Sequence, residues 1–203
     1  MDKVNAFKKE LTYIKDQKYR ENAEVLINLL PDYFFEVAAS STGKYHPSFS
    51  LGEGGLLRHT KAAVRIAHEM FNDESITSSF SPKEKDMMII ALMLHDGLKH
   101  GREKSEYTKF EHPILICDYI KENKDKTTFS DNEISALCNM IESHMGPWNT
   151  NSYSDVVLPV PSNKYQRFVH MCDFLSSRKF LDVKFDGNDI VDWQEQMFVI
   201  YCK

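Results

Sequence analysis

Hydrophobic residues recur at helical spacing along most of the chain. In segments 7–14 and 25–30, apolar side chains are spaced three or four positions apart, which places them on one face of a helix. Pro31 then favours the start of a further short helix, because proline suits the first helical turn. Residues 1–40 are therefore predicted to be helical.

Two capping signals mark the starts of two later helices. Ser81-Pro82-Lys83-Glu84 combines an N-cap serine, a first-turn proline and a glutamate three positions after the cap, ahead of the apolar run 87–94. A helix that is apolar on all sides is predicted to be central and buried. A second capping box, Ser130-Asp131-Asn132-Glu133, precedes an amphipathic helix that is predicted to end at Gly146-Pro147.

Three further helices are predicted: residues 56–71, a segment that starts at Pro113, and residues 163–179. The stretches 40–55 and 149–163 are rich in Ser, Gly, Asn and Pro and are predicted to be loops. Strand-like alternation is scarce, so the fold class is predicted to be an all-α bundle. The last 15 residues, with Trp193, Phe198 and Ile200, fit either helix or strand.

The chain has 203 residues, which predicts one domain with N-terminal helices in 1–40, a core at about 45–180 and a C-terminal extension in 181–203. Its longest apolar run falls far short of the roughly 20 residues that span a membrane. The N-terminus has no secretory signal pattern, so we expect a cytoplasmic protein with no membrane partner. The pattern leaves its oligomeric state open.

Cysteine usage and net charge narrow the chemistry. No two cysteines form a CxxC pair, so Cys117, Cys138, Cys172 and Cys202 are predicted to be free thiols. The net charge of -5 argues against adhesion to nucleic acid through overall charge, although a local basic patch remains compatible with it.

Candidate chemistry begins at the end of the buried helix, where His95 and Asp96 stand side by side. A carboxylate is doubly unfavourable there, because it faces the negative end of the helix dipole and lies in dry surroundings. A bound cation would remove both penalties, with the adjacent imidazole as a second ligand. The pair therefore predicts a metal site.

Other histidines and an aspartate stand at helix ends or in apolar stretches, namely His59, His112, His144 and Asp173. In this order the chain resembles the HD phosphohydrolase superfamily. The resemblance rests on GGLLRHT, LMLHDGLK and FVHMCDFLSSR, with EHP and ESHMG similar to the second-metal motifs of some members. It covers about residues 45–180 and is closest in detail to bacterial HD-domain exoribonuclease-like proteins.

The resemblance implies a helical HD-type domain that hydrolyses a phosphoester with metal-activated water. It implies one divalent ion, from among Mn, Fe, Ni, Co, Zn and Mg, held by His59, His95, Asp96 and Asp173. Asp96 would bridge to a second ion held by His112 and His144. Asp96 and Lys99 would be catalytic, with Lys99 close to the substrate phosphate.

Two departures from the family pattern affect these expectations. Gly97 and Leu98 stand in the reverse of the usual order after the aspartate, so the turn could differ there. Met145 follows His144 where some dinuclear members have a second histidine, so the second ion is expected to bind more weakly or not at all.

The substrate is expected to be a phosphorylated small molecule such as a nucleotide, or a short nucleic acid. Arg58, Lys99 and Arg102 are candidates for binding its phosphate, although such residues also serve as ordinary surface charge. Aromatic residues in the predicted loops could stack on a base or fix the loops to the core; they are Tyr45, His46, Trp148 and Tyr153.

Two alternatives remain open. A degenerate HD fold could bind a nucleotide or a protein partner without turnover. A structural metal would have a closed set of protein ligands and no open coordination position. His68 and His170 receive no role from the pattern.

Overall fold

The structure is a computed structural model that describes residues 2–40, 43–44 and 46–192. These residues are mostly helical, as predicted. The α-helices are α1 (Lys8–Leu11), α2 (Gln17–Leu29), α3 (Gly55–Phe71), α4 (Glu74–Thr77), α5 (Pro82–Leu94), α6 (His112–Glu122), α7 (Asp131–Glu142) and α8 (Lys164–Ser176). Short 3-10 helices lie at η1 (Asn5–Phe7), η2 (Asp32–Phe35), η3 (Ser48–Ser50) and η4 (Lys124–Lys126).

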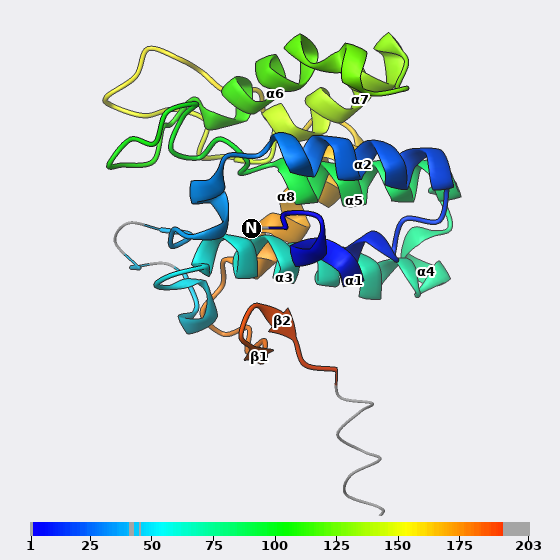
Figure 1. The fold of residues 1–203 in the computed structure, drawn as a ribbon, viewed down its shortest axis with the longest axis horizontal. Coiled ribbons are helices and arrows are strands. Elements are labelled where there is room, and N and C mark those ends of the chain that lie inside the picture. The colour runs from blue at the N-terminus through cyan, green and yellow to red at the C-terminus, as the bar shows by residue number, and fades with distance from the viewer. Residues whose placement is uncertain (1, 41–42, 45, 193–203) are drawn as a thin grey trace, which may run out of the picture.

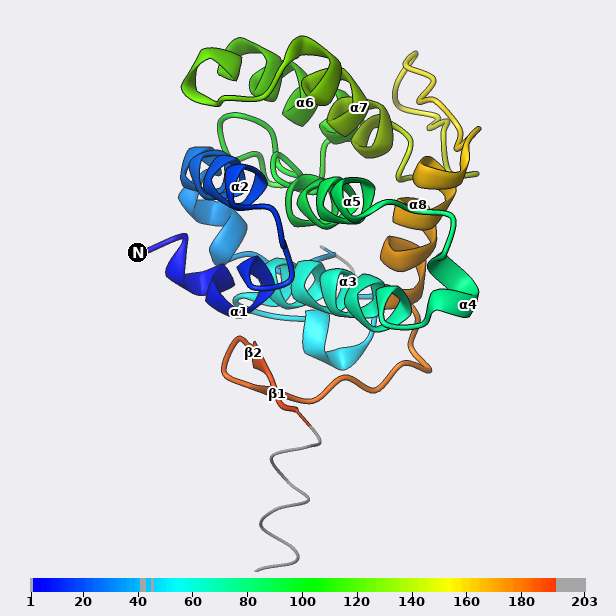
Figure 2. The same ribbon diagram turned by 90° about the vertical axis from the view of Figure 1, so that its right-hand side faces the viewer.

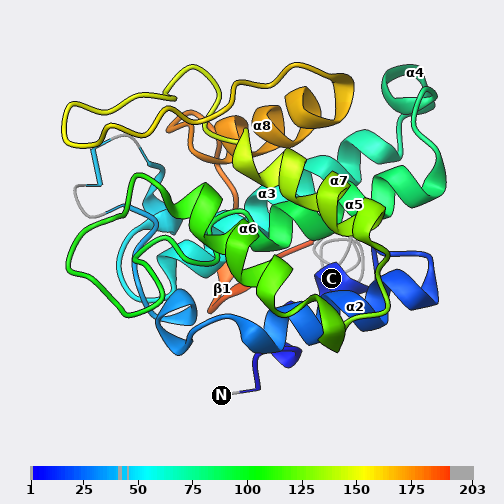
Figure 3. The same ribbon diagram turned by 90° about the horizontal axis from the view of Figure 1, so that it is seen from above.

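The helices are stacked in layers (Figures 1 and 2). Helices α6 and α7 form an outer layer, α2 and α5 lie beneath them, and α1 and α3 form the next layer. Helix α8 runs across one side of the stack, next to α3, α5 and α7, as the view from above also shows (Figure 3). Helix α5 contacts α2, α3, α7 and α8, so it is the central helix.

The sequence of α5 explains its position. Ser81 Oγ accepts a hydrogen bond from Glu84 N at 3.3 Å, and the Glu84 carboxylate accepts one from Ser81 N at 2.7 Å, so the predicted capping box is formed. Every side chain from Met87 to Leu94 is buried. At roughly 1.5–3 kcal/mol for each large apolar side chain, this burial fixes α5 in the core.

Two helices were predicted to extend too far at their C-terminal ends. Helix α7 ends at Glu142, about one turn before Gly146-Pro147, and α8 ends at Ser176 rather than near residue 179. The predicted α3 and the capping box of α7 are confirmed. Sequence patterns locate helix starts better here because a capping box marks a start, whereas the ends lack an equally specific signal.

A short antiparallel hairpin was not predicted. It pairs β1 (Phe185–Asp186) with β2 (Asp189–Ile190) around Gly187 and Asn188, and these are the only named strands within the described ranges. Gly187 has φ +57°, a left-handed conformation that suits glycine, so this two-residue Gly-Asn turn was the available signal. Trp193, Phe198 and Ile200, which fitted either helix or strand, lie outside the described residues.

Cys117, Cys138 and Cys172 are buried free thiols, as predicted, while Cys202 lies outside the described residues. Within the described part of the chain, every helix is too short or too polar to cross a bilayer.

The capping box of α7 generates a testable prediction about stability. Burial acts to raise the pKa of Glu133, but hydrogen bonds from Ser130, Lys18 and Tyr19 outweigh it and lower the pKa to about 2. A depressed carboxyl pKa stabilises the folded state above the unfolded-state pKa, near 4.5, and this contribution is lost as the pH falls toward 2. We expect Glu133→Gln to unfold more easily than wild type at pH 7, by roughly 1 kcal/mol or less because the group is partly exposed.

This difference in the free energy of unfolding should shrink between pH 4.5 and pH 2, as measured by urea denaturation across that range. Glu21→Gln, on the exposed side of α2, is the matched control. A Glu133→Gln difference that stays constant with pH would contradict the assignment.

Candidate metal centre

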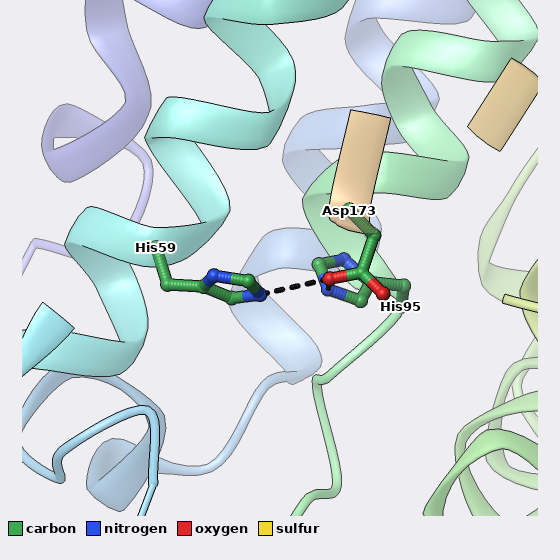
Figure 4. A group of neighbouring side chains, drawn as sticks. All are labelled: His59, His95 and Asp173. Atoms are coloured by element: carbon green, nitrogen blue, oxygen red, sulfur yellow. Dashed lines mark ion pairs between the residues drawn. The ribbon is translucent and has the colours of Figure 1, made fainter. Parts of the chain in front are cut away.

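Five helices bring the six predicted ligands to one point. His59 lies on α3, His95 and Asp96 follow α5, and Asp173 lies in the last turn of α8. His112 is the first residue of α6, and His144 follows the end of α7. Figure 4 shows His59, His95 and Asp173 directed toward one another from their three helices. Asp173 is partly buried, and the other five are at most 2% exposed.

One group of ligand atoms surrounds Oδ2 of Asp96. His59 Nε2 lies 3.7 Å from this oxygen and His95 Nε2 lies 3.5 Å from it. The same two nitrogens lie 3.0 and 3.4 Å from Oδ1 of Asp173. Two ligand atoms of a tetrahedral ion with metal–nitrogen bonds of about 2.0–2.1 Å are roughly 3.3 Å apart, so the spacing of His59, His95 and Asp173 suits a single ion.

A second group faces the other oxygen of Asp96. His112 Nε2 lies 3.0 Å from Oδ1, and His144 Nε2 lies 3.7 Å from it. The two imidazole nitrogens are 3.3 Å apart. The Asp96 carboxylate therefore stands between two sets of nitrogens, which is the bridging arrangement that the resemblance implied.

Hydrogen bonds fix which nitrogen of each imidazole faces the centre. The Nδ1 atoms of His95, His112 and His144 lie 2.7–2.8 Å from the main-chain carbonyls of Leu92, Lys109 and Ile141 respectively. A carbonyl can only accept, so in each ring Nδ1 is the protonated donor. The neutral form of each ring then directs the lone pair of Nε2 into the centre, as metal-binding histidines do.

His59 reaches the same state through a serine. Ser176 Oγ donates its proton to the Asp173 carbonyl at 2.8 Å. Its oxygen is therefore left to accept from Nδ1 of His59 at 3.1 Å. Ser176 was not predicted as part of the site, and no sequence signal marked it, because its role depends on contact with a residue 117 positions away.

This arrangement brings the lone pairs of several buried nitrogen and oxygen atoms close together. His59 Nε2, His95 Nε2 and Asp96 Oδ1 are buried without a hydrogen-bond partner among the described residues. Unpaired buried polar atoms are costly and need a compensating group. A cation between His59 and His95 would satisfy their two nitrogens, and one beside His112 and His144 would satisfy Asp96 Oδ1, so the donor set fits divalent metal. Imidazole and carboxylate ligands suit Mn, Fe, Co, Ni and Zn.

The pKa values of Asp96 and His95 shift in the directions that favour positive charge at the centre. Burial acts to raise the pKa of Asp96, but Lys99, His95 and His112 outweigh it and hold the pKa well below its ordinary value. Burial likewise acts to lower the pKa of His95, but the carboxylates of Asp96 and Asp173 raise it overall. His144 differs, since burial and nearby His95 lower its pKa to about 3, which keeps its imidazole neutral.

The ligands open onto a cavity of about 630 Å³. Five of the six line it, the exception being His95, and Lys99 lines it with its Nζ 2.5 Å from Asp96 Oδ2. A volume of this size is typical of small-molecule sites. The other lining residues are Ala39, Ser40, His46, Thr108, Met145, Trp148, Phe174, Ser177 and Arg178.

The other predicted substrate-binding residues are not in this cavity. Arg58 lies on α3 and donates to the carbonyls of Phe49 and Leu51 and to Asn188, which ties it to the η3 loop and the hairpin. Arg102 pairs with Glu122 at the surface. Of the three residues predicted to bind phosphate, the structure brings only Lys99 to the centre.

The predicted aromatic residues also separate. His46 and Trp148 line the cavity, and the ring of His46 packs edge-on against His59 with centroids 5.5 Å apart. Burial and nearby His59 lower the pKa of His46 to about 4. Tyr153 is 95% exposed and outside the cavity, and Tyr45 lies outside the described residues.

Close packing explains the Gly97-Leu98 order after Asp96. A Cβ atom at Gly97 would lie 2.6 Å from Leu30 Cδ2 and 3.0 Å from the Leu94 carbonyl, so a larger residue there would force its neighbours to shift. Leu98 is buried in the core, and Lys99 still reaches Asp96. Lys99 therefore contacts Asp96 with Gly97 and Leu98 in this order.

The ligand geometry predicts metal-dependent stability. Excess manganese, nickel or zinc should raise the thermal midpoint of the wild-type protein, because an ion at about 100 times its Kd stabilises the folded state by about 2.7 kcal/mol. We expect Asp96→Ala to abolish this rise, since it removes both bridging oxygens. His68→Gln, which replaces a histidine outside the six-ligand cluster, is the control and should keep the rise. An equal rise for Asp96→Ala and wild type, with metal content measured in parallel, would contradict this centre.

Comparisons of the chain with models of protein families, with curated proteins and with solved structures found no match in any of the three. The residues of the centre and their geometry therefore carry the evidence for a function.

Proposed function

We propose that this protein is a metal-dependent phosphohydrolase of the HD type. The observation that carries the proposal is the Asp96 carboxylate, which has two imidazole nitrogens facing each of its oxygens at the floor of a cavity. The order of the six ligands along the chain supports the HD assignment, since it matches the motifs that the sequence resembles.

The donor set gives each residue a definite task. His59, His95, Asp96 and Asp173 would hold one divalent ion, and Asp96, His112 and His144 would hold a second. A bound divalent ion supplies a more acidic water, with a pKa of about 7, and stabilises charge on phosphoryl oxygens. The hydrogen bonds that Nδ1 donates keep each imidazole in the tautomer that binds metal, so the centre is already organised before substrate arrives.

The charge of the cavity favours a phosphate ester. Among the residues that line it, the charges of Lys99 and Arg178 balance those of Asp96 and Asp173. Each divalent ion adds two positive charges, so the loaded cavity attracts an anion. Lys99 is positioned to hold a phosphate oxygen beside Asp96, and its ammonium group would stabilise the charge that develops there.

A purely structural ion fits the site less well. Structural sites are closed by their protein ligands, whereas catalytic sites keep a position open. Here five of the six ligands line a cavity large enough for a small molecule. This exposure to the cavity favours turnover over a structural role.

Hydrolysis tests the proposal directly. Protein loaded with manganese, nickel or cobalt should release phosphate or alcohol from at least one phosphomonoester or phosphodiester in a panel of nucleotides, sugar phosphates and short oligonucleotides. His59→Ala should lose this activity and remain folded. Full metal occupancy with no turnover on any member of the panel would favour the alternative of a binding module without catalysis.

Lys99 supplies a sharper prediction. We expect Lys99→Met to lower kcat/KM by about 100-fold, because it removes a cation from the position of the phosphate. Arg102→Met is the matched control, since it removes a nearby cation that pairs with Glu122 outside the cavity, and it should change kcat/KM less than about twofold. Equal losses in the two variants, at equal metal content, would contradict the role of Lys99.

A further inference from the structure

One wall of the cavity is aromatic. We use the name aromatic wall for Trp148, Phe174 and Arg178, which all line the cavity. The rings of Trp148 and Phe174 are nearly parallel, with centroids 5.7 Å apart and planes at 13°. The Arg178 guanidinium lies 4.2 Å from the Phe174 centroid and 6.0 Å from that of Trp148.

Hydrogen bonds to the C-terminal end of α8 hold Arg178 in place. Arg178 Nε donates to the Phe174 carbonyl at 3.1 Å, and its Nη2 donates to Ser177 Oγ at 2.7 Å. No carboxylate within the described ranges pairs with this guanidinium in an ion pair. Neutral groups therefore position Arg178, and its positive charge is available to interact with a ligand.

Part of the aromatic wall remains exposed. Trp148 is 51% exposed although it stacks on Phe174. An indole that only fixed its loop to the core would be expected to bury more of its large apolar surface. A half-exposed indole beside a guanidinium in a ligand-sized cavity is instead suited to a second planar ring.

The wall and the metal centre belong to the same site. Phe174 directly follows the candidate ligand Asp173 in α8, so this helix carries one residue of each part. Because both parts line one cavity, a ligand whose phosphate lies at the centre extends toward the wall.

We infer that the aromatic wall is a subsite for a nucleobase, so that the substrate is a nucleotide rather than an aliphatic phosphate ester. The inference rests on the proposed function for the position of the phosphate. Any of the bases can stack on an aromatic ring, so the wall selects for the presence of a base and not for its identity. The guanidinium of Arg178 adds attraction for the π-face of the base.

Binding of a matched ligand pair tests the inference. The pair consists of the non-hydrolysable phosphonate analogues of a nucleoside 5′-monophosphate and of ribose 5-phosphate, which differ only in the base. Their Kd values would be measured by isothermal titration calorimetry on metal-loaded protein. We expect the nucleotide analogue to bind at least about tenfold more tightly, because stacking on an aromatic side chain is worth about that factor or more.

Variants separate recognition from folding. Trp148→Ala should lower this Kd ratio about tenfold and leave the Kd of the ribose analogue unchanged, while Trp148→Phe should keep most of the ratio. Tyr153→Ala, which removes the most exposed aromatic side chain in the 149–163 loop, is the control and should leave the ratio unchanged. Thermal midpoints of all variants would be recorded with the same samples.

The outcomes are distinct. Equal binding of both analogues by wild type, or a ratio that Trp148→Ala does not change, would overturn the inference even if phosphoesters are hydrolysed. A base-dependent ratio that is lost in Trp148→Ala would support the subsite. If no phosphoester were hydrolysed while that ratio persisted, the proposed function would fail and the base subsite would stand.

Discussion

The structure depends on the cluster of imidazole nitrogens and carboxylate oxygens around Asp96. Four imidazole nitrogens lie 3.0–3.7 Å from the oxygens of two carboxylates in a largely buried position. The proton of each imidazole is on Nδ1, where it is hydrogen-bonded to a main-chain carbonyl or to Ser176, so it does not lie between the nitrogens and the carboxylates. Such a centre is unfavourable without positive charge, and the helices that build it must supply the free energy that holds it together.

Helix α5 supplies much of that free energy. Its continuous apolar surface is buried against four other helices, and His95 and Asp96 follow immediately after it. Because the helix is fixed by packing on all sides, the position of the two ligands is fixed as well. Asp173 is likewise in the last turn of α8, so both carboxylates lie at the negative ends of helix dipoles, where a cation is favoured.

Much of this could be predicted from the sequence, for physical reasons. Capping boxes and apolar runs are local signals, so the starts of α5 and α7 and the burial of α5 were predicted correctly. The six candidate ligands could be picked out because His and Asp are rare in apolar segments and stood there in an order that resembles a known family. Contacts between distant segments have no local signal, which is why Ser176 was missed and why Arg58 and Arg102 were predicted to bind phosphate although they lie outside the cavity.

The hairpin changes how the C-terminal part of the chain is understood. On α3, Lys61 pairs with Asp189 at 2.7 Å and Arg65 pairs with Asp192, while His59 on the same helix belongs to the centre. Lys61 is only 1% exposed, and without the hairpin its remaining carboxylate partner among the described residues would be Glu10 at 3.7 Å. Leaving a buried ammonium group poorly paired is strongly destabilising. Residues 185–192 thus stabilise α3, the helix that carries His59. Removing them would disturb the position of His59 in the candidate metal centre.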